Sequence, residues 1–238
     1  TEEWFKARLG KVTASRVADV LAKIKTGEAA VRKNYKMELV VQRLTGQPPE
    51  SFTNAAMEWG TATEPQARMA YEAHREVFVE EVGFIDHPTI EGFGCSPDGV
   101  VGEGLIEIKC PNTATHIETI IDEKAPSKYI PQMQCQMAVT GAKWCDFVSF
   151  DPRVPEELQL FVVRVDRDQE YIDQMTSEKR VLAGNSKPIW EQIGKRPNHL
   201  WDCEVIGLLP ALAWRLTGRN VDLEPPAQTE DNKPATAT

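Results

Sequence analysis

The segment at residues 96–110, which reads SPDGVVGEGLIEIKC, constrains this chain more than any other stretch. Asp98 sits in a Pro-Asp-Gly turn, and Glu107 and Lys109 are two residues apart in the strand-like run 105–109. Because side chains alternate along a strand, Glu107 and Lys109 share one face and the intervening isoleucines share the other. The short glycine-containing link lets the strand fold back beside the turn. The sequence therefore predicts that two carboxylates and one ammonium group converge.

These groups suit the hydrolysis of a phosphodiester bond. The reaction needs an attacking water, neutralisation of charge on phosphorus and assistance to the leaving oxygen. Mg²⁺ prefers hard oxygen ligands and can supply all three effects, and we expect Mn²⁺ to substitute for it. Asp98, Glu107 and the backbone carbonyl of Ile108 are the candidate ligands. Lys109 would stabilise developing negative charge and orient or deprotonate the water.

The pattern also has an ordinary explanation. Pro-Asp-Gly is a common turn, and Glu-x-Lys on a strand is a common solvated pair. Two observations favour the functional interpretation. The charged residues lie among Leu105, Ile106 and Ile108, where an unpaired charge is costly, and further motifs flank the segment on both sides.

Three flanking motifs occur in a fixed order. They are WFKARLGKVTAS at residues 4–15, EWGTATE at 58–64 and YIPQMQ at 129–134. Together with residues 96–110 they resemble the phage lambda exonuclease family, also called YqaJ-like viral recombinases, in the PD-(D/E)XK nuclease superfamily. The resemblance covers roughly residues 2–175 and implies a restriction-endonuclease-like α/β core.

The resemblance implies a role for several residues at the predicted metal site. Glu64 resembles the helix-borne acid that completes the ligand set with Asp98 and Glu107. Lys109 resembles the catalytic lysine, and Gln132 resembles the active-site glutamine of the family. Without the family context, Glu64 reads as a solvated helix acid and Gln132 as a surface amide.

The resemblance also implies a pocket for the 5′-phosphate of a DNA end, formed by Arg8, Ser15 and Ser96. An arginine fork with hydroxyl donors suits a terminal phosphate, and Ser15 opens a predicted helix whose N-terminus favours anions. The alternatives are a surface arginine at Arg8 and an ordinary helix cap at Ser15.

These roles together imply a metal-dependent exonuclease that digests the 5′-ended strand of linear duplex DNA and leaves 3′ single-stranded overhangs for phage-type homologous recombination. The family resemblance also implies a homotrimeric ring around DNA and a single-strand annealing protein as partner. An endonuclease of the same superfamily, of the restriction or DNA-packaging type, is an alternative. A non-catalytic recombination or packaging adaptor is another, although the complete set of Glu64, Asp98, Glu107 and Lys109 argues against it.

The net charge of −9 is unusual for a protein that binds DNA, because phosphate contacts dominate affinity. The charge is unevenly distributed. Residues 1–49 hold ten Lys or Arg and five Asp or Glu, a local charge of +5, which leaves −14 for the remainder. Locally focused positive charge matters more for binding than the total, so this N-terminal part could line a DNA channel. The alternative is a pair of ordinary solvated helices.

Five scattered cysteines without a C-x-x-C pair indicate a reducing compartment and argue against a structural zinc site or a cysteine-ligated iron–sulfur cluster. No run of 18 apolar residues occurs in the sequence, so we expect no membrane span and a cytoplasmic location in a bacterial or phage-infected cell.

The hydrophobic periodicity predicts helices followed by strands, further helices and two more strands, which suits a mixed sheet of about five strands flanked by helices. If Pro65 occupies the first turn of a new helix, Glu64 lies at its start. The active site is expected at one sheet edge. The helices are expected at 15–24, 28–45, 54–74, 114–124 and 128–139, and the strands at 77–83, 92–95, 105–109, 144–150 and 158–165.

We expect a nuclease domain at 1–183, a helical extension at 184–218 and a disordered tail at 219–238. A further helix begins at 173–182 and is broken by GNSKP at 184–188. Residues 196–204 resemble the C-terminal end of some phage terminase large subunits, in which a late acid can serve the metal site. Asp202 is therefore a minor candidate, and the alternative is a structural role for Trp201 beside the apolar helix expected at 205–216.

Overall fold

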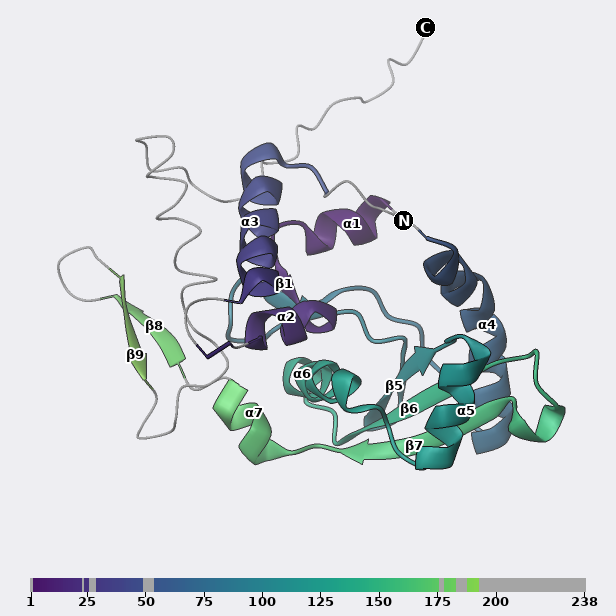
Figure 1. Cartoon of the computed structure of the whole chain (residues 1–238). Coiled ribbons are helices and arrows are strands. Elements are labelled where there is room, and N and C mark those ends of the chain that lie inside the picture. The colour runs from purple at the N-terminus through teal and green to yellow at the C-terminus, as the bar shows by residue number, and fades with distance from the viewer. Residues whose placement is uncertain are drawn as a thin grey trace, which may run out of the picture.

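A four-stranded mixed sheet lies at the centre of the computed structural model (Figure 1), which describes residues 2–22, 24, 25, 29–48, 54–175, 178–182 and 188–192. β5 runs antiparallel to β4 and parallel to β6, and β6 is antiparallel to β7. The mixed α/β fold expected from the sequence is confirmed, with four strands in this sheet where about five were expected. The order across the sheet is β4 (Gly99–Val101), β5 (Gly104–Lys109), β6 (Trp144–Phe150) and β7 (Leu160–Asp166).

A second, smaller sheet precedes the central one along the chain. In it, β3 (Phe93–Cys95) lies between β1 (Val12–Thr13) and β2 (Ile85–Asp86). β1 and β3 are parallel, and Thr13 is paired with Gly94. This pairing brings the N-terminal segment beside the residues that lead into the turn at Asp98.

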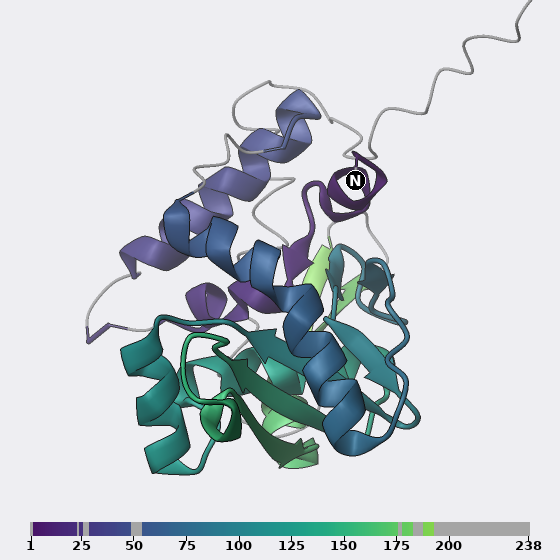
Figure 2. The same ribbon diagram turned by 90° about the vertical axis from the view of Figure 1, so that its right-hand side faces the viewer.

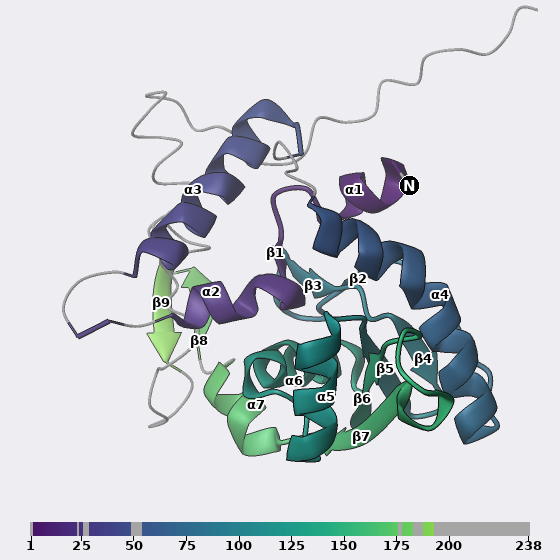
Figure 3. The ribbon, with the colours of Figure 1, turned by 45° about the vertical axis from the view of Figure 1, so that its right-hand side comes forward.

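Helices cover both faces of the central sheet. Figures 2 and 3 show α4 on one face and α5 and α6 on the other. No helix in the described ranges is long and apolar enough to cross a membrane. The helical elements are α1 (Glu2–Arg8), η1 (Ala14–Arg16), α2 (Val17–Leu21), α3 (Ala30–Thr45), α4 (Ala55–Arg75), α5 (Thr113–Asp122), η2 (Ser127–Tyr129), α6 (Ile130–Thr140), η3 (Glu156–Leu158) and α7 (Gln169–Met175).

Side chains of β5 alternate between the two helical layers. Ile106 packs in the cluster that contains Tyr71 of α4, whereas Leu105 packs in the cluster that contains Met133 of α6. The period of two along a strand therefore directs Glu107 toward α6. The alternation predicted for this strand is confirmed.

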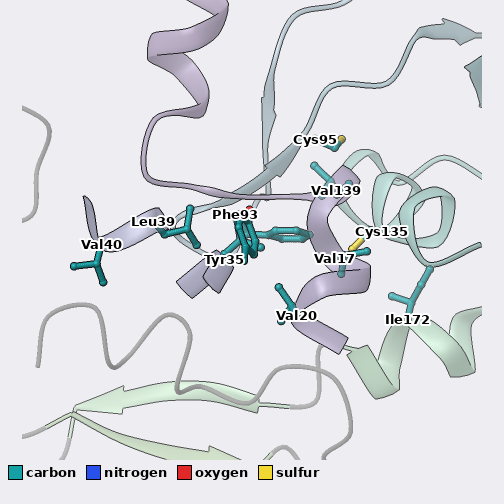
Figure 4. Close-up of a cluster of buried hydrophobic side chains, with 12 residues drawn as sticks. Val17, Val20, Tyr35, Leu39, Val40, Phe93, Cys95, Cys135, Val139 and Ile172 are labelled. Atoms are coloured by element: carbon teal, nitrogen blue, oxygen red, sulfur yellow. The ribbon is translucent and has the colours of Figure 1, made fainter. Parts of the chain in front are cut away.

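A third buried cluster joins the N-terminal elements to the rest of the fold (Figure 4). It combines α2, α3, β3, α6 and α7, so the first helices are packed against the layer that carries the candidate site. Its fully buried aliphatic and aromatic side chains each contribute about 1.5–3 kcal/mol. Its labelled members are Val17, Val20, Tyr35, Leu39, Val40, Phe93, Cys95, Cys135, Val139 and Ile172.

The strand expected at 77–83 is wrong. In this stretch Glu80 exchanges two backbone hydrogen bonds with Val100, of 3.0 and 2.9 Å, and forms only an isolated bridge. Hydrogen-bonded pairs alternate along antiparallel strands. β4 is three residues long and centred on Val100, so its outer edge offers a single such pair.

Pro65 does not begin a new helix. α4 continues through it without interruption, so Glu64 lies in the middle of the helix. Pro65 cannot bond the carbonyl of Thr61. Both residues are exposed, which leaves that carbonyl open to water.

Two other helical expectations are also corrected. The helix expected at 15–24 is a 3₁₀ turn followed by α2, which ends at Leu21. The helix expected at 173–182 is wrong in its second half, because α7 ends at Met175 and β8 (Glu178–Leu182) pairs with β9 (Pro188–Gln192). Backbone pairing with a partner strand overrides the local helical pattern there. The rest of the expected C-terminal extension, Trp201, Asp202 and the expected tail lie outside the described residues.

Candidate active site

The turn at Asp98 is bonded directly to β5. Gly99 pairs with Ile106, so the residue before β4 comes to lie opposite Glu107. The backbone N–H of Ile108 donates to Asp98 Oδ2 at 2.6 Å. The hairpin therefore brings the two carboxylates together as the sequence spacing predicted, and the backbone of β5 orients one of them.

Glu107 is fully buried and is held by three donors. Lys109 Nζ forms an ion pair with its Oε1 atom, and Gln132 Nε2 donates to the same oxygen at 2.6 Å. Gln136 Nε2 donates to Oε2 at 2.7 Å. A buried charge is costly unless it is paired and hydrogen-bonded, and this carboxylate satisfies both conditions.

The sequence interpretation brought Asp98, Glu107, Lys109 and Gln132 together, and the structure places all four at one end of β5 and the start of α6. It missed Gln136. The signal that could have found it is the spacing of four residues from Gln132, since residues i and i+4 lie on the same face of a helix.

Lys109 also lies against an aromatic ring. Its Nζ is 5.3 Å from the centre of the Tyr129 ring, a cation–π contact that the sequence did not indicate. Burial alone would lower the pKa of Lys109, but the neighbouring Glu107 and Asp98 carboxylates outweigh it and raise the pKa. Lys109 is therefore a charged ammonium group in this arrangement.

For Asp98, unlike Lys109, the effects of burial and of the nearby acids favour the neutral form. Burial, followed by the charges of Glu107 and Glu64, raises its pKa to about 8, although Lys109 and the Ile108 N–H act in the other direction. A carboxyl group whose pKa is raised by other acids lies where negative charge is in excess. Such sites are candidates for cation binding and catalysis.

Asp151 is a second acid of this fold, and its pKa is shifted in the opposite direction. Asp151 is fully buried and accepts hydrogen bonds from Arg153 Nε at 2.7 Å and from Thr113 Oγ1 at 2.6 Å. Although burial raises the pKa of Asp151, these bonds lower it to about 2. Asp98, in contrast, accepts no arginine bond among the described residues, and its pKa responds to burial and to the charges of Glu107 and Glu64.

Glu64, on α4, is paired with an arginine. Arg68 NH2 donates to its Oε1 at 2.9 Å, and Arg68 NH1 also pairs with Glu81 at 2.5 Å. Glu64 contributes to the raised pKa of Asp98, so the two acids are electrostatically coupled. The described residues contain no group of three His, Cys, Asp or Glu side chains arranged around one metal position.

The predicted phosphate-binding residues lie at the adjacent sheet. Arg8 ends α1, its NH1 donates to Ser96 Oγ at 3.4 Å, and its guanidinium stacks 4.0 Å from the centre of the Trp4 ring. Burial lowers the pKa of Arg8, which has no acidic partner among the described residues. A half-buried arginine without a carboxylate can accept a phosphate.

Ser15 is close to this position through the strand register. Thr13 is paired with Gly94 in parallel strands, so Ser15 and Ser96 each follow a paired residue by two and leave the same end of the sheet. Ser15 Oγ lies 3.1 Å from Thr13 Oγ1. The helix-N-terminus argument for Ser15 is weakened, because Ser15 lies inside a 3₁₀ turn that leads into the five-residue α2.

Much of the positive charge in the N-terminal part is already paired. Lys6 pairs with Glu2 at 2.9 Å, and Lys11 pairs with Asp86 at 2.7 Å. Arg16 likewise bonds two acids. Arg8 therefore stands out among these basic residues as a candidate ligand for DNA.

The profile of the YqaJ-like viral recombinase domain matches residues 3–143, more than half of the 238 residues. The chain belongs to the YqaJ-like viral recombinase family. The resemblance inferred from the motifs is thereby confirmed. The matched range includes Arg8, Glu64, Asp98, Lys109 and Gln132.

This family member is similar to two solved structures of LHK-Exo, an alkaline exonuclease from Laribacter hongkongensis. The structure in complex with dAMP is 49% identical, with a TM-score of 0.74, and the other is 48% identical, with a TM-score of 0.73. Each match covers 92% of this chain and 99% of LHK-Exo. No curated protein matches the chain.

Two more distant similarities were found. A phage-related exonuclease from Haemophilus somnus 129PT is 19% identical over 68% of this chain and 87% of its own, with a TM-score of 0.56, and shares the fold. The endonuclease domain of the terminase large subunit gpA matches residues 135–221 of this YqaJ-family chain. That range contains the segment 196–204, which the sequence interpretation likened to terminases.

Proposed function

We propose that this YqaJ-family protein is a metal-dependent exonuclease that digests the 5′-ended strand of linear duplex DNA. The observation that carries the proposal is the hydrogen bond from Arg8 to Ser96, a residue that precedes Asp98 closely in the chain. Asp98 follows Ser96 by two positions, a span of at most about 7 Å. A terminal phosphate held at Arg8 would therefore lie near a phosphodiester held at Asp98.

The site residues have distinct roles in this proposal. Lys109 stabilises negative charge that develops on the scissile phosphate and orients the attacking water. Gln132, a half-buried residue that bonds Glu107, assists in placing that water. Arg8 anchors the terminal phosphate, with Ser15 and Ser96 as hydroxyl donors.

The acidic residues fit a divalent cation. Repulsion from Glu107 and Glu64 adds to the effect of burial in raising the pKa of Asp98. A bound cation would offset that repulsion, and the donors are hard oxygens of the type that Mg²⁺ and Mn²⁺ prefer. Asp98, Glu107, the Ile108 carbonyl and Glu64 would hold the metal. When bound, it would neutralise charge on the phosphate and lower the pKa of the attacking water.

The similarity to LHK-Exo supports exonuclease chemistry in particular. That protein is described as an alkaline exonuclease and was solved in complex with dAMP, a deoxynucleoside monophosphate. We propose the same class of product here, together with a 3′ single-stranded overhang that serves phage-type recombination. A homotrimer around DNA and a single-strand annealing partner belong to this proposal, and mass measurement in solution tests the trimer.

The decisive experiment uses linear duplex DNA labelled at either the 5′ or the 3′ end, with Mg²⁺ or with EDTA. We expect Mg²⁺-dependent release of the 5′ label as mononucleotide, while the 3′ label stays on a long single strand. Early release of the 3′ label as mononucleotide would overturn the polarity. Unchanged activity in EDTA would overturn the metal requirement.

An endonuclease is the second candidate, because residues 135–221 match a terminase endonuclease domain. Covalently closed circular DNA separates the two functions. An enzyme that requires an end leaves the circle intact, whereas an endonuclease linearises it. The same circle, opened by a restriction enzyme, is the matched positive control.

A further inference from the structure

Gln136 is a buried amide that bonds the Glu107 oxygen not contacted by Lys109 or Gln132. Its side chain is 1% exposed and donates to Glu107 Oε2 at 2.7 Å. Gln132 and Lys109 are both half-buried and contact the other oxygen, Oε1. Gln136 therefore cannot touch DNA, and its contact with the site passes through Glu107.

The two glutamines act on Glu107 from successive turns of α6. A carboxylate held at one oxygen can still rotate about its terminal bond, which has a broad torsional preference. Donors to both oxygens remove that freedom. With Oε2 bound to Gln136, Oε1 stays directed toward the half-buried Lys109 and Gln132.

Gln136 is not explained by packing alone. Its Oε1 atom is buried and has no hydrogen-bond partner among the described residues. Turning the amide over would place this oxygen against the Glu107 carboxylate, where two acceptors repel each other. The side chain thus keeps one buried acceptor unsatisfied while it donates to Glu107, a cost that a purely apolar residue would avoid.

We propose that Gln136 is a positioning residue that sets the orientation of Glu107 for divalent-metal binding. The inference rests on the proposed function, in which Glu107 is a metal ligand. Groups that orient a metal ligand from behind alter metal affinity or activity by about 10–100-fold when they are removed. Gln136 fits this description because it contacts the proposed ligand and is itself buried.

The test compares Gln136→Met with Gln134→Met. Gln134 is the matched control, because it is also a buried glutamine on α6 and is 3% exposed. Its side chain donates to the Asp166 carbonyl at 2.8 Å and accepts from the Asp168 N–H at 2.9 Å, and it makes no bond to Glu107 among the described residues. Mn²⁺ binding is measured by titration calorimetry without DNA, and folding by circular-dichroism melting. Nuclease rates against Mn²⁺ concentration provide a second readout.

We expect the Mn²⁺ dissociation constant of Gln136→Met to rise about tenfold or more, while Gln134→Met binds Mn²⁺ like the parent. Gln136→Ala, which adds no volume, should show the same loss of affinity while it remains folded. Parent-like Mn²⁺ binding in both Gln136 variants would overturn this inference and leave the proposed function standing. Unfolding of both would also overturn it, since the amide would then be a structural requirement. A parent protein that binds no Mn²⁺ would instead reject the proposed metal site.

Discussion

Asp98 Oδ2 accepts a 2.6 Å hydrogen bond from the backbone N–H of Ile108, between the two charged residues of β5. This bond joins the turn that carries one acid to the strand that carries the other. The backbone, rather than a basic side chain, thus orients Asp98. Its carboxyl group is left near Glu107, where negative charge is in excess.

Asp98→Ala should abolish cleavage while the protein remains folded. The variant removes a proposed metal ligand, and we expect the rate on linear duplex DNA to fall by at least about 10²-fold. Lys109→Ala should have a similar effect, because it removes the ammonium group that stabilises developing charge. Asp122→Ala, which removes an exposed acid at the end of α5, is the control and should cleave normally. Retained cleavage in Asp98→Ala would contradict the assignment.

Arg8→Ala should remove the preference for 5′-phosphorylated ends. The parent is expected to digest 5′-phosphate DNA faster than 5′-hydroxyl DNA, because the terminal phosphate binds the Arg8 guanidinium, which has no acidic partner in the described part of the chain. The variant should treat the two ends alike and should be less processive. Lys6→Ala is a matched control on α1, since Lys6 is exposed and already paired with Glu2. The phosphate pocket is wrong if the parent itself does not distinguish the two ends.

The stability of the metal-free protein should decrease from pH 5 to pH 9 in part because of Asp98. Its folded-state pKa is raised from 3.8 to about 8, so the native state holds a proton that the unfolded state has released. This contribution is fully present below the unfolded pKa and is lost as pH rises through 8. The measurement is the melting temperature in EDTA, and Asp98→Asn should give a flatter profile.

The affinity for a divalent metal should increase with pH, in contrast to the stability of the metal-free protein. A cation must displace the Asp98 proton, so the Mn²⁺ concentration needed for half-maximal binding should fall as pH rises toward 8. The increase in melting temperature caused by Mn²⁺ should therefore be larger at pH 8 than at pH 6. Equal increases at the two values would mean that Asp98 is not a ligand or is not protonated.

Gly94→Ala should destabilise the fold. A Cβ atom at Gly94 would collide with the backbone carbonyl of Ile85 and with the Phe84 ring, and the backbone cannot yield cheaply. We expect a loss of about 1–3 kcal/mol, measured by denaturant unfolding. Gly60→Ala is the control. A Cβ atom there meets nothing within 4 Å in α4, and alanine should stabilise the helix by about 0.5–1 kcal/mol. An equal loss of stability in both variants would mean that the close contacts of Gly94 in the small sheet do not make alanine costly there.

Local rules of the chain determined the centre of the candidate site. The period of two along 105–109 placed Glu107 and Lys109 on one face, and the Pro-Asp-Gly turn with its short glycine link returned Asp98 beside them. The strand at 144–150 was predicted with the bounds that the structure shows. These features depend on residues a few positions apart, so side-chain alternation and turn chemistry are sufficient to predict them.

Tertiary structure alone decided what surrounds that centre. Tyr129 contacts Lys109, and Gln136 contacts Glu107. Both contacts arise because η2 and α6 pack on the sheet with one rotation of the α6 axis. Ser15 and Ser96 leave the same sheet end because β1 and β3 pair in one register.

The physical reason is the range of the interactions involved. Helix rotation and strand register are chosen by burial of side chains from segments distant in the sequence, and by the backbone bonds that those segments exchange. Two predictions failed for this reason. Local signals favoured a helix start at Pro65 and a continuing helix at 178–182, whereas α4 runs through Pro65 and 178–182 is a strand. Turn and strand chemistry predicted which groups meet at the Asp98 turn, and the packing of distant elements set how those groups are held.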